Sequence, residues 1–170
     1  VELISSLRSS DLNDLCDAAE MAIIDGGGFG WLAPPPRDIL EAYWNGVLLI
    51  PERDLLVGRL DGVIAGSCQV FRPARNNEAT SFACNLTTNF VAPWARGHGL
   101  SAKLIEAAEA QAMGMGFDVL NLDVRETQIA AIRLFEGLGY TKFGEHSYYA
   151  RVDGKYVKGC FYYKKLREKV

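Results

Sequence analysis

The chain has 170 residues, of which 49% are hydrophobic, and this length and composition fit one globular domain with a substantial core. Its formal net charge of −3 argues against a nucleic-acid partner, which would require a basic face. No apolar run approaches the roughly 20 residues of a membrane span, and the first residues lack the basic and apolar segments of a signal peptide.

The N-terminal part of the sequence predicts one short strand and two helices. The strand is expected within residues 1–7, where polar and apolar residues alternate weakly. Asp11 is placed to cap a helix over 12–24, because apolar residues recur there at helical spacing. A run of prolines then leads into a second helix over 36–46.

The glycine-rich run 26–30 separates these helices and carries two aromatic residues with it. Neither a lysine nor a serine or threonine follows the glycines, so a connecting loop is favoured over a phosphate-binding loop. Phe29 and Trp31 are costly to leave in water. The loop is therefore expected to fold onto the body of the protein or to cover a ligand.

The middle of the chain predicts three strands. The first two, over 54–60 and 63–71, are joined by a tight Asp61-Gly62 turn. A longer connection over 72–78 leads to the third strand, over 80–91. Polar residues interrupt this last strand and predict a bulge or a splay that leaves ladder groups free for a ligand: Asn85, Thr87, Thr88 and Asn89.

The C-terminal part alternates helices and strands and then ends in a hairpin. The expected elements are a helix from 100 to 114, a strand over 117–124, a helix over 127–138, and strands over 140–151 and 155–166 joined by an Asp-Gly turn. The complete order is β-α-α-β-β-β-α-β-α-β-β. The strand–helix–strand unit in its centre fits a right-handed parallel pairing.

An anion site is expected where the central strand ends at Pro93 and the next helix begins. Proline cannot continue a sheet ladder, and Gly97 and Gly99 allow a tight turn that a ligand can approach closely. The first helical turn leaves N–H groups unpaired beside a partial positive charge, which suits a phosphate or pyrophosphate. No Gly-Lys-Ser/Thr follows, which argues against a Walker loop, whereas a dinucleotide fingerprint ending in alanine stays open on spacing alone.

The four cysteines are widely scattered, form no Cys-x-x-Cys pair and have no histidine nearby. No zinc site or other metal site is therefore expected. Reduced, buried thiols in a cytoplasmic protein are the expectation, with a catalytic cysteine as the less favoured alternative.

The stretch 91–104 resembles motif A of the GCN5-related N-acetyltransferases, the GNAT superfamily. That motif reads Gln/Arg-x-x-Gly-x-Gly/Ala, and Arg96 and Gly99 match it. Ser101 takes the last place, which is a mild departure because serine is also small.

The stretch 128–140 is similar to motif B of the same superfamily. Gln128 stands where asparagine is usual and Phe135 where tyrosine is usual, and the matching positions are Ala131, Leu134, Gly139 and Tyr140. The resemblance covers the whole chain. It implies a GNAT fold, an α/β (α+β) domain over residues 1–170 with a mixed, mostly antiparallel sheet of six or seven strands and about four helices. More loosely, the glycine-rich run, the stretch Ala42-Tyr43-Trp44 and the terminal stretch 161–166 resemble the tabtoxin-resistance-like branch of the family.

The resemblance implies acetyl-CoA as cosubstrate and no metal. Main-chain amides of the glycine loop would hold the pyrophosphate, with the Arg96 side chain adding charge; the residues concerned are Arg96, Gly97, His98, Gly99, Leu100 and Ser101. A main-chain N–H of Phe90 or Val91 would polarise the thioester carbonyl. Gln128 and Phe135 are further expected contacts of the cofactor.

Acetyl transfer also needs a base, because an alkylammonium with a pKa near ~10 cannot attack. Asp123, near the carboxyl end of a central parallel strand, is the first candidate, directly or through water. Glu126 and Glu78 are the less favoured candidates. The alternative roles of Asp123 are to cap the next helix or to pair with Arg125. Family members often protonate the departing thiolate with a tyrosine; because Phe135 cannot, Tyr140 is the candidate acid, with solvent and the tyrosines of the final hairpin as alternatives.

The function expected is transfer of an acetyl group to a primary amine of a small molecule or peptide by direct attack, with Phe29, Trp31 and Tyr148 as acceptor contacts. The departures at Gln128 and Phe135 motivate an alternative, an acyl-CoA-binding sensor with weak or no catalysis. A nucleotide-binding module is a third reading. No nucleic acid or membrane is expected as a partner, and a homodimer is an open expectation because many relatives form dimers.

Overall fold

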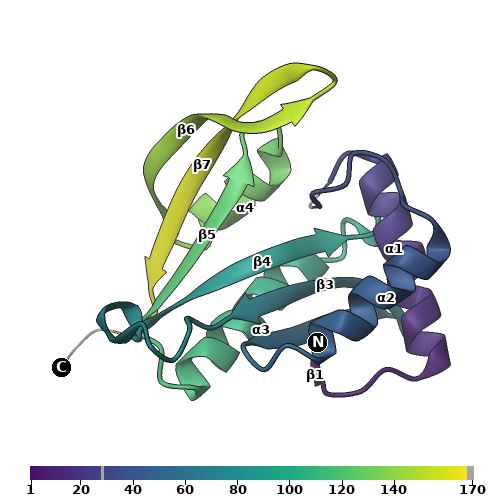
Figure 1. Ribbon diagram of the computed structural model, residues 1–170, viewed down its shortest axis with the longest axis horizontal. Coiled ribbons are helices and arrows are strands. Elements are labelled where there is room, and N and C mark those ends of the chain that lie inside the picture. The colour runs from purple at the N-terminus through teal and green to yellow at the C-terminus, as the bar shows by residue number, and fades with distance from the viewer. Residues whose placement is uncertain (28, 168–170) are drawn as a thin grey trace.

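The computed structural model describes residues 1–27 and 29–167, so Gly28 of the glycine-rich run lies outside the described residues. Seven strands form one sheet in the order β1-β2-β3-β4-β5-β7-β6 (Figure 1). All neighbours are antiparallel except β4 and β5, which are parallel. The elements are β1 Glu2–Ile4, α1 Ser9–Ile24, α2 Arg37–Leu48, β2 Arg53–Leu60, β3 Val63–Phe71, β4 Ala83–Val91, α3 Leu100–Gly114, β5 Val119–Arg125, α4 Ile129–Gly137, β6 Thr141–Val152 and β7 Lys155–Lys165. The predicted order, sheet type and strand number are confirmed.

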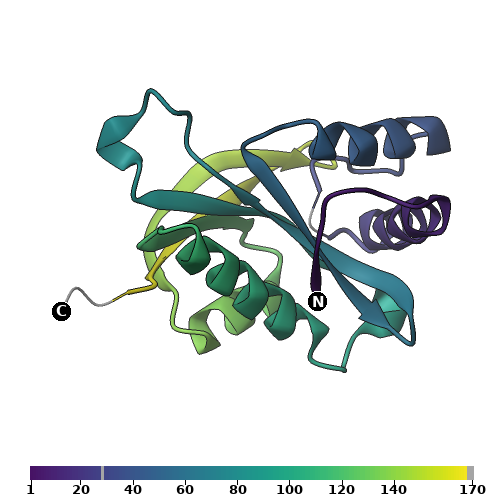
Figure 2. The same ribbon diagram turned by 90° about the horizontal axis from the view of Figure 1, so that it is seen from below.

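Helices cover both faces of the sheet. α1 and α2 lie on one face, and α3 and α4 lie on the other (Figure 2). One face of α3 packs against the strands, and its side chains at Leu104, Ile105, Ala108 and Ala112 are completely buried. On the opposite face, Trp44 of α2 is completely buried among residues of α1 and β2.

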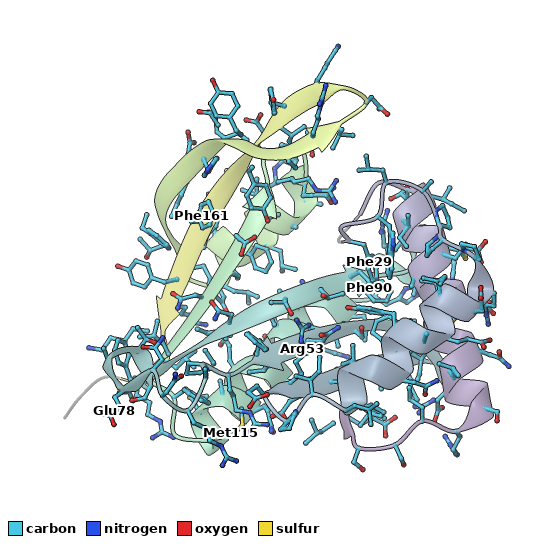
Figure 3. The ribbon with its side chains drawn as sticks, viewed as in Figure 1. Phe29, Arg53, Glu78, Phe90, Met115 and Phe161 are labelled. Atoms are coloured by element: carbon cyan, nitrogen blue, oxygen red, sulfur yellow. The ribbon has the colours of Figure 1, made fainter. Side chains whose placement is uncertain are left out.

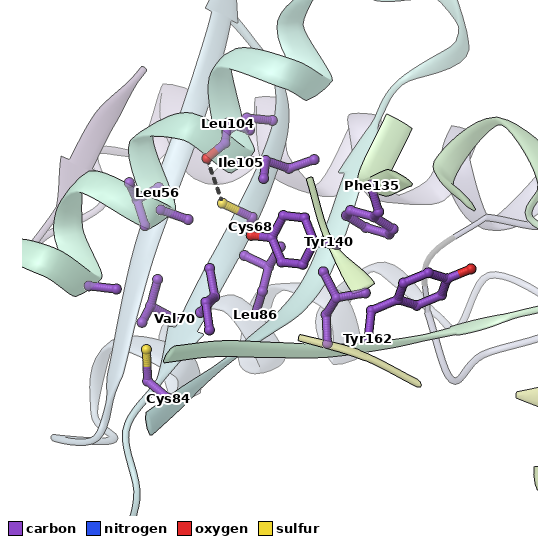
Figure 4. Packing of buried hydrophobic residues seen from close by; sticks show 14 of the residues in the cluster. Leu56, Cys68, Val70, Cys84, Leu86, Leu104, Ile105, Phe135, Tyr140 and Tyr162 are labelled. Atoms are coloured by element: carbon purple, nitrogen blue, oxygen red, sulfur yellow. Dashed lines mark hydrogen bonds between the residues drawn. The ribbon is translucent and has the colours of Figure 1, made fainter. Parts of the chain in front are cut away.

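The four cysteines are all free and buried. Cys68 donates to the Leu104 carbonyl oxygen at 3.5 Å inside the core (Figure 4), and burial raises the pKa of its thiol to about 12. Burial also raises the pKa of Cys16 to about 11 and that of Cys84 to about 12. These three thiols are therefore protonated near neutral pH and act as core side chains rather than nucleophiles.

The described residues contain no cluster of three or more His, Cys, Asp or Glu side chains that could hold a metal ion. In that same part of the chain, no helix combines the length and the hydrophobicity that crossing a membrane requires.

The start of α1 differs from the prediction. Arg8, not Asp11, is the N-cap residue, and no side chain caps the helix. Asp11 lies one turn further in, where it is 3% exposed and pairs with Arg8 at 2.9 Å and with Arg59 at 3.0 Å. The hydrogen bond from Arg8 is the main cause that lowers the pKa of Asp11. Arg8, close in sequence, and Arg59 of β2 therefore hold this carboxylate together, and the local pattern does not contain the second partner.

β4 and β5 pair only at their beginnings and then diverge. Their registered pairs run from Ala83 with Val119 to Asn85 with Asn121, and beyond them the strands separate (Figure 1). β4 also has one extra residue against β3 in the interval that contains Thr88, whose φ is 48°. The predicted bulge and the predicted splay are thus both present.

A buried polar network lies behind this bulge. Arg53 donates to Gln69 Oε1 at 2.7 Å, and Gln69 Nε2 donates to the Tyr43 hydroxyl at 3.0 Å. That hydroxyl lies 3.5 Å from Thr88 Oγ1. Because Gln69 is completely buried, its amide depends on these partners for its hydrogen bonds, and the network holds the bulge in place.

Removing the hydroxyl in Tyr43→Phe should lower the free energy of unfolding by about 1–3 kcal/mol, since a buried amide donor loses its acceptor. Urea denaturation measures this loss. Tyr156→Phe on the exposed hairpin is the matched control and should change stability by less than about 0.5 kcal/mol. Equal stabilities of the two variants would show that the network does not support the bulge.

A candidate active-site cleft between the diverging strands

The splay between β4 and β5 opens into two cavities that share a wall. One has a volume of about 620 Å³ and reaches the start of α3, and the other has a volume of about 510 Å³ and reaches β6. Asn89, Gln128 and Ala131 line both cavities. The two cavities therefore adjoin along one cleft; after the roles that the sequence predicts, we call the part beside α3 the cofactor end and the part beside β6 the acceptor end.

Main-chain amides line the cofactor end. Gly97 and Gly99 have φ values of 81° and 72°, and a Cβ at either residue would enter open space. Lys103 is the first residue of α3 whose N–H donates to a carbonyl earlier in the chain, that of Gly99, at 3.2 Å. Among residues 1–27 and 29–167, the N–H groups of Leu100, Ser101 and Ala102 therefore have no backbone partner and can bind a ligand, beside the positive end of the helix dipole. Gly97, Gly99, Leu100 and Ser101 all line this cavity.

Two residues of the loop are placed differently from the expectation. Arg96 lines the cavity, but its guanidinium pairs with Asp25 at 2.6 Å, so its charge is already balanced. The His98 ring does not line the cavity; its Nδ1 lies 3.0 Å from the Arg96 carbonyl and 3.3 Å from the Ala95 carbonyl. His98 thus fixes the shape of the loop through its side chain.

The end of β4 directs one amide toward the cleft. Ala92 N–H donates to Ala65 of β3 at 2.7 Å, and the Phe90 carbonyl lies against Gly66 of the same strand. Backbone groups of successive residues point to opposite edges of a strand, so the Val91 N–H faces the other edge, which borders the cleft. Of the two residues predicted to polarise a carbonyl, Val91 has the required orientation.

Two buried oxygen atoms in the cleft lack hydrogen-bond partners among the described residues: Thr87 Oγ1 and Asn89 Oδ1. Asn89 lies where the two cavities meet. A ligand that carries amide N–H groups would satisfy such acceptors, as the pantetheine arm of coenzyme A does. Together with the amide cradle at α3, these atoms fit the cosubstrate that the sequence implies.

At the acceptor end, Asp123 accepts a hydrogen bond from the Tyr149 hydroxyl. Burial, and then this bond, raise the pKa of Tyr149, so the phenol is protonated near neutral pH and acts as a donor. The Tyr149 ring lies directly over Gly159 of β7, where any side chain would collide with it. A register shift in β6 between His146 and Ala150 brings Tyr149 to this position. Asp123 therefore neither caps α4 nor pairs with Arg125 among the described contacts.

Tyr148 and Tyr140 do not reach the cleft. Tyr148 is 70% exposed, packs against Tyr156 with ring centroids 5.0 Å apart, and lines neither cavity. Tyr140 lies in the core beside Phe135 (Figure 4), lines neither cavity, and has its pKa raised by burial. The expected roles of Tyr148 in acceptor binding and of Tyr140 as an acid are therefore corrected; Phe135 itself lines the acceptor end.

The aromatic loop folds onto the body of the protein, which is the first of its two expected alternatives, and it borders the cleft there. Phe29 is buried, lines the acceptor end and packs against Phe90 with ring centroids 4.8 Å apart (Figure 3). Trp31 does not line the cavity but supports Phe29, at 6.2 Å between centroids. Arg125 donates to the Phe29 carbonyl at 2.6 Å and Gln128 to the Gly26 carbonyl at 2.7 Å, so both tie the loop to the opposite wall.

Comparisons with known proteins identify the family of the chain. The model of the acetyltransferase (GNAT) family matches residues 17–140. The chain belongs to the GNAT family. This GNAT protein is 65% identical over 128 residues to an uncharacterised N-acetyltransferase from the hisH–hisA intergenic region of Azospirillum brasilense, covering 75% of this chain and 76% of that protein.

Solved structures share the fold of this GNAT protein at low sequence identity. An N-acetyltransferase from Staphylococcus aureus Mu50 superimposes with a TM-score of 0.79 at 20% identity, covering 95% of this chain and 96% of that chain. A phosphinothricin acetyltransferase of the GNAT superfamily from Sinorhizobium meliloti, in complex with acetyl-CoA, gives a TM-score of 0.77 at 17% identity, covering 97% and 88%.

The sequence of this GNAT protein did not predict that the Tyr149 ring lies over Gly159 and that its hydroxyl donates to Asp123. The available signal was Gly159, a glycine inside a strand, which often marks a bulge or the close approach of another group. That signal does not name its partner, because the partner depends on the register shift in β6.

Proposed function

We propose that this GNAT protein transfers the acetyl group of acetyl-CoA to a primary amine of a small molecule or peptide by direct attack. The observation that carries the proposal is the continuity of the cleft, from free amides at the start of α3 to the Asp123 carboxylate at the other end. Such a cleft suits two substrates that meet at its centre. The acetyl-CoA complex of the S. meliloti relative supports the choice of cosubstrate.

At the cofactor end, the chain's own groups would bind and orient. Amides of Gly97, Gly99, Leu100 and Ser101 hold the pyrophosphate, and Asn89 Oδ1 accepts from an amide of the pantetheine arm. Acetyl-CoA supplies a thioester whose carbonyl carbon the amine attacks. The Val91 N–H donates to the carbonyl oxygen and stabilises the negative charge that develops there.

At the acceptor end, Asp123 takes a proton from the incoming ammonium group, directly or through water. Tyr149 donates to Asp123 and fixes its orientation. Phe135 has no proton to give and Tyr140 lies in the core, so solvent protonates the departing thiolate, whose free pKa is about 8.5.

The test follows free thiol release from acetyl-CoA against a panel of amines, amino acids and short peptides. Acceptor-dependent release is the expected result. Tight coenzyme A binding without acceptor-dependent release across the panel would favour a sensor over an enzyme, and binding of ATP in place of coenzyme A would favour a nucleotide-binding module.

A further inference from the structure

The acceptor end carries more positive than negative charge. Its charged lining residues are Asp123, Arg125 and Arg151. Within residues 1–27 and 29–167, neither of these two arginines has a carboxylate within 4.0 Å. Five other arginines are paired in this way: Arg8, Arg37, Arg59, Arg72 and Arg96. Four further arginines also lack a carboxylate partner in this part of the chain, but none of them lines either cavity: Arg53, Arg75, Arg133 and Arg167. The acceptor end is therefore the place in the cleft where two guanidinium groups without a carboxylate partner occur together.

The positions of the three charged groups are fixed by the strands. Asp123 and Arg125 are two residues apart on β5, so they share a face and are separated by about 7 Å of strand. One Arg125 nitrogen donates to Phe29, which leaves its other donors for a ligand. Arg151 of β6 lies 5.8 Å from the centroid of the Tyr156 ring, which supports its guanidinium from one side.

A simple cationic amine does not complement this cavity, because two positive charges face one negative charge that is already bonded to Tyr149. An acceptor with its own anionic group next to the amine would balance the charges. The planar fork of arginine matches a carboxylate in a bidentate arrangement. The acetyl and pantetheine parts of coenzyme A are uncharged, so the cosubstrate leaves both arginines free.

We propose that the acceptor is an amine that also carries a carboxylate, such as an amino acid, with Arg151 and Arg125 binding the carboxylate and Asp123 facing the amine. This inference rests on the proposed function and specifies its substrate class. The cavity of about 510 Å³ has room for such a molecule.

The first experiment measures thiol release from acetyl-CoA with matched pairs: amino acids and the same amino acids with a carboxamide in place of the carboxylate. Loss of a bidentate charged contact should lower kcat/KM for the amide by about 100-fold, mainly through KM. Arg151→Gln should erase most of this preference and Arg151→Lys should restore part of it. The control is Arg75→Gln on an exposed loop, which should keep the preference.

A second experiment needs no catalysis. Calorimetric titration of the chain compares N-acetylated amino acids with N-acetylated amino amides, in the wild type and in Arg151→Gln. Binding that requires both the carboxylate and Arg151 is the expected result, whatever the activity. Equal affinity for both ligands, or equal thiol release from amino acids and amides, overturns the carboxylate proposal while leaving the acetyltransferase function intact. If no amine causes thiol release, that result counts against the acetyltransferase function and not against the carboxylate proposal. The titration then tests the carboxylate proposal by itself.

Discussion

Gly99→Trp should lose coenzyme A affinity by at least about 100-fold while the chain still folds. Gly99 is the N-cap of α3 with φ of 72°, and its missing side chain leaves open space beside the free amides. An indole in that space would block a pyrophosphate from two or more N–H groups, each contact to a charged group contributing about 1.5–3 kcal/mol. Calorimetric titration with coenzyme A gives the affinity, and circular dichroism checks the fold.

The matched control for this variant is Gly62→Trp. Gly62 also has a positive φ, 84°, and open space around it, but it lies in the β2–β3 hairpin and not in the cleft. Both variants should lose about 1–2 kcal/mol of stability from the left-handed backbone, and only Gly99→Trp should lose the ligand. Retained affinity in Gly99→Trp would remove the cofactor from this loop.

Asp123→Asn should lower kcat by about 100- to 10,000-fold, the usual contribution of a general base, and should leave coenzyme A affinity unchanged. The variant depends on amine that is already deprotonated in solution, and that fraction falls tenfold for each pH unit below the amine pKa. The deficit relative to the wild type should therefore be largest near pH 6 and shrink toward pH 9. Steady-state rates of thiol release across this range provide the measurement.

Tyr149→Phe is the companion variant for Asp123→Asn. It removes the hydroxyl that orients the carboxylate but keeps the carboxylate and the ring over Gly159. Its kcat should fall only about tenfold, the value of one hydrogen bond. If Asp123→Asn and the wild type had equal rates across pH 6–9, the carboxylate would not be the base.

The sequence predicted those parts of the fold and cleft that depend on local chemistry. Pro93, Gly97 and Gly99 act within a few residues of themselves, so the end of β4 and the start of α3 lie where the sequence places them. The Asp-Gly turns at 61–62 and 153–154 have positive φ at both residues, as tight hairpins require. The bulge at Thr88 was also visible, because polar residues interrupt an apolar strand.

Contacts between distant strands could not be predicted. The bond between Tyr149 and Asp123 joins residues 26 positions apart, and a register shift decides that Tyr149 rather than Tyr148 faces the cleft. Asp11 pairs with Arg59 of another element instead of capping its own helix. Tyr140 matches its position in motif B, yet its ring packs in the core with residues of α3 and β7.

The short pairing between β4 and β5 ends at Asn85, so the edge of β4 from Leu86 to Val91 is not paired with β5. A ligand with its own amide groups would hydrogen-bond to this edge as a neighbouring strand does. It would thereby link β1 to β4 with β5 to β7. Binding energy would then add directly to folding energy, by about 2.7 kcal/mol when the ligand is present at 100 times its Kd. The resistance of the protein to proteolysis would consequently rise with the concentration of coenzyme A.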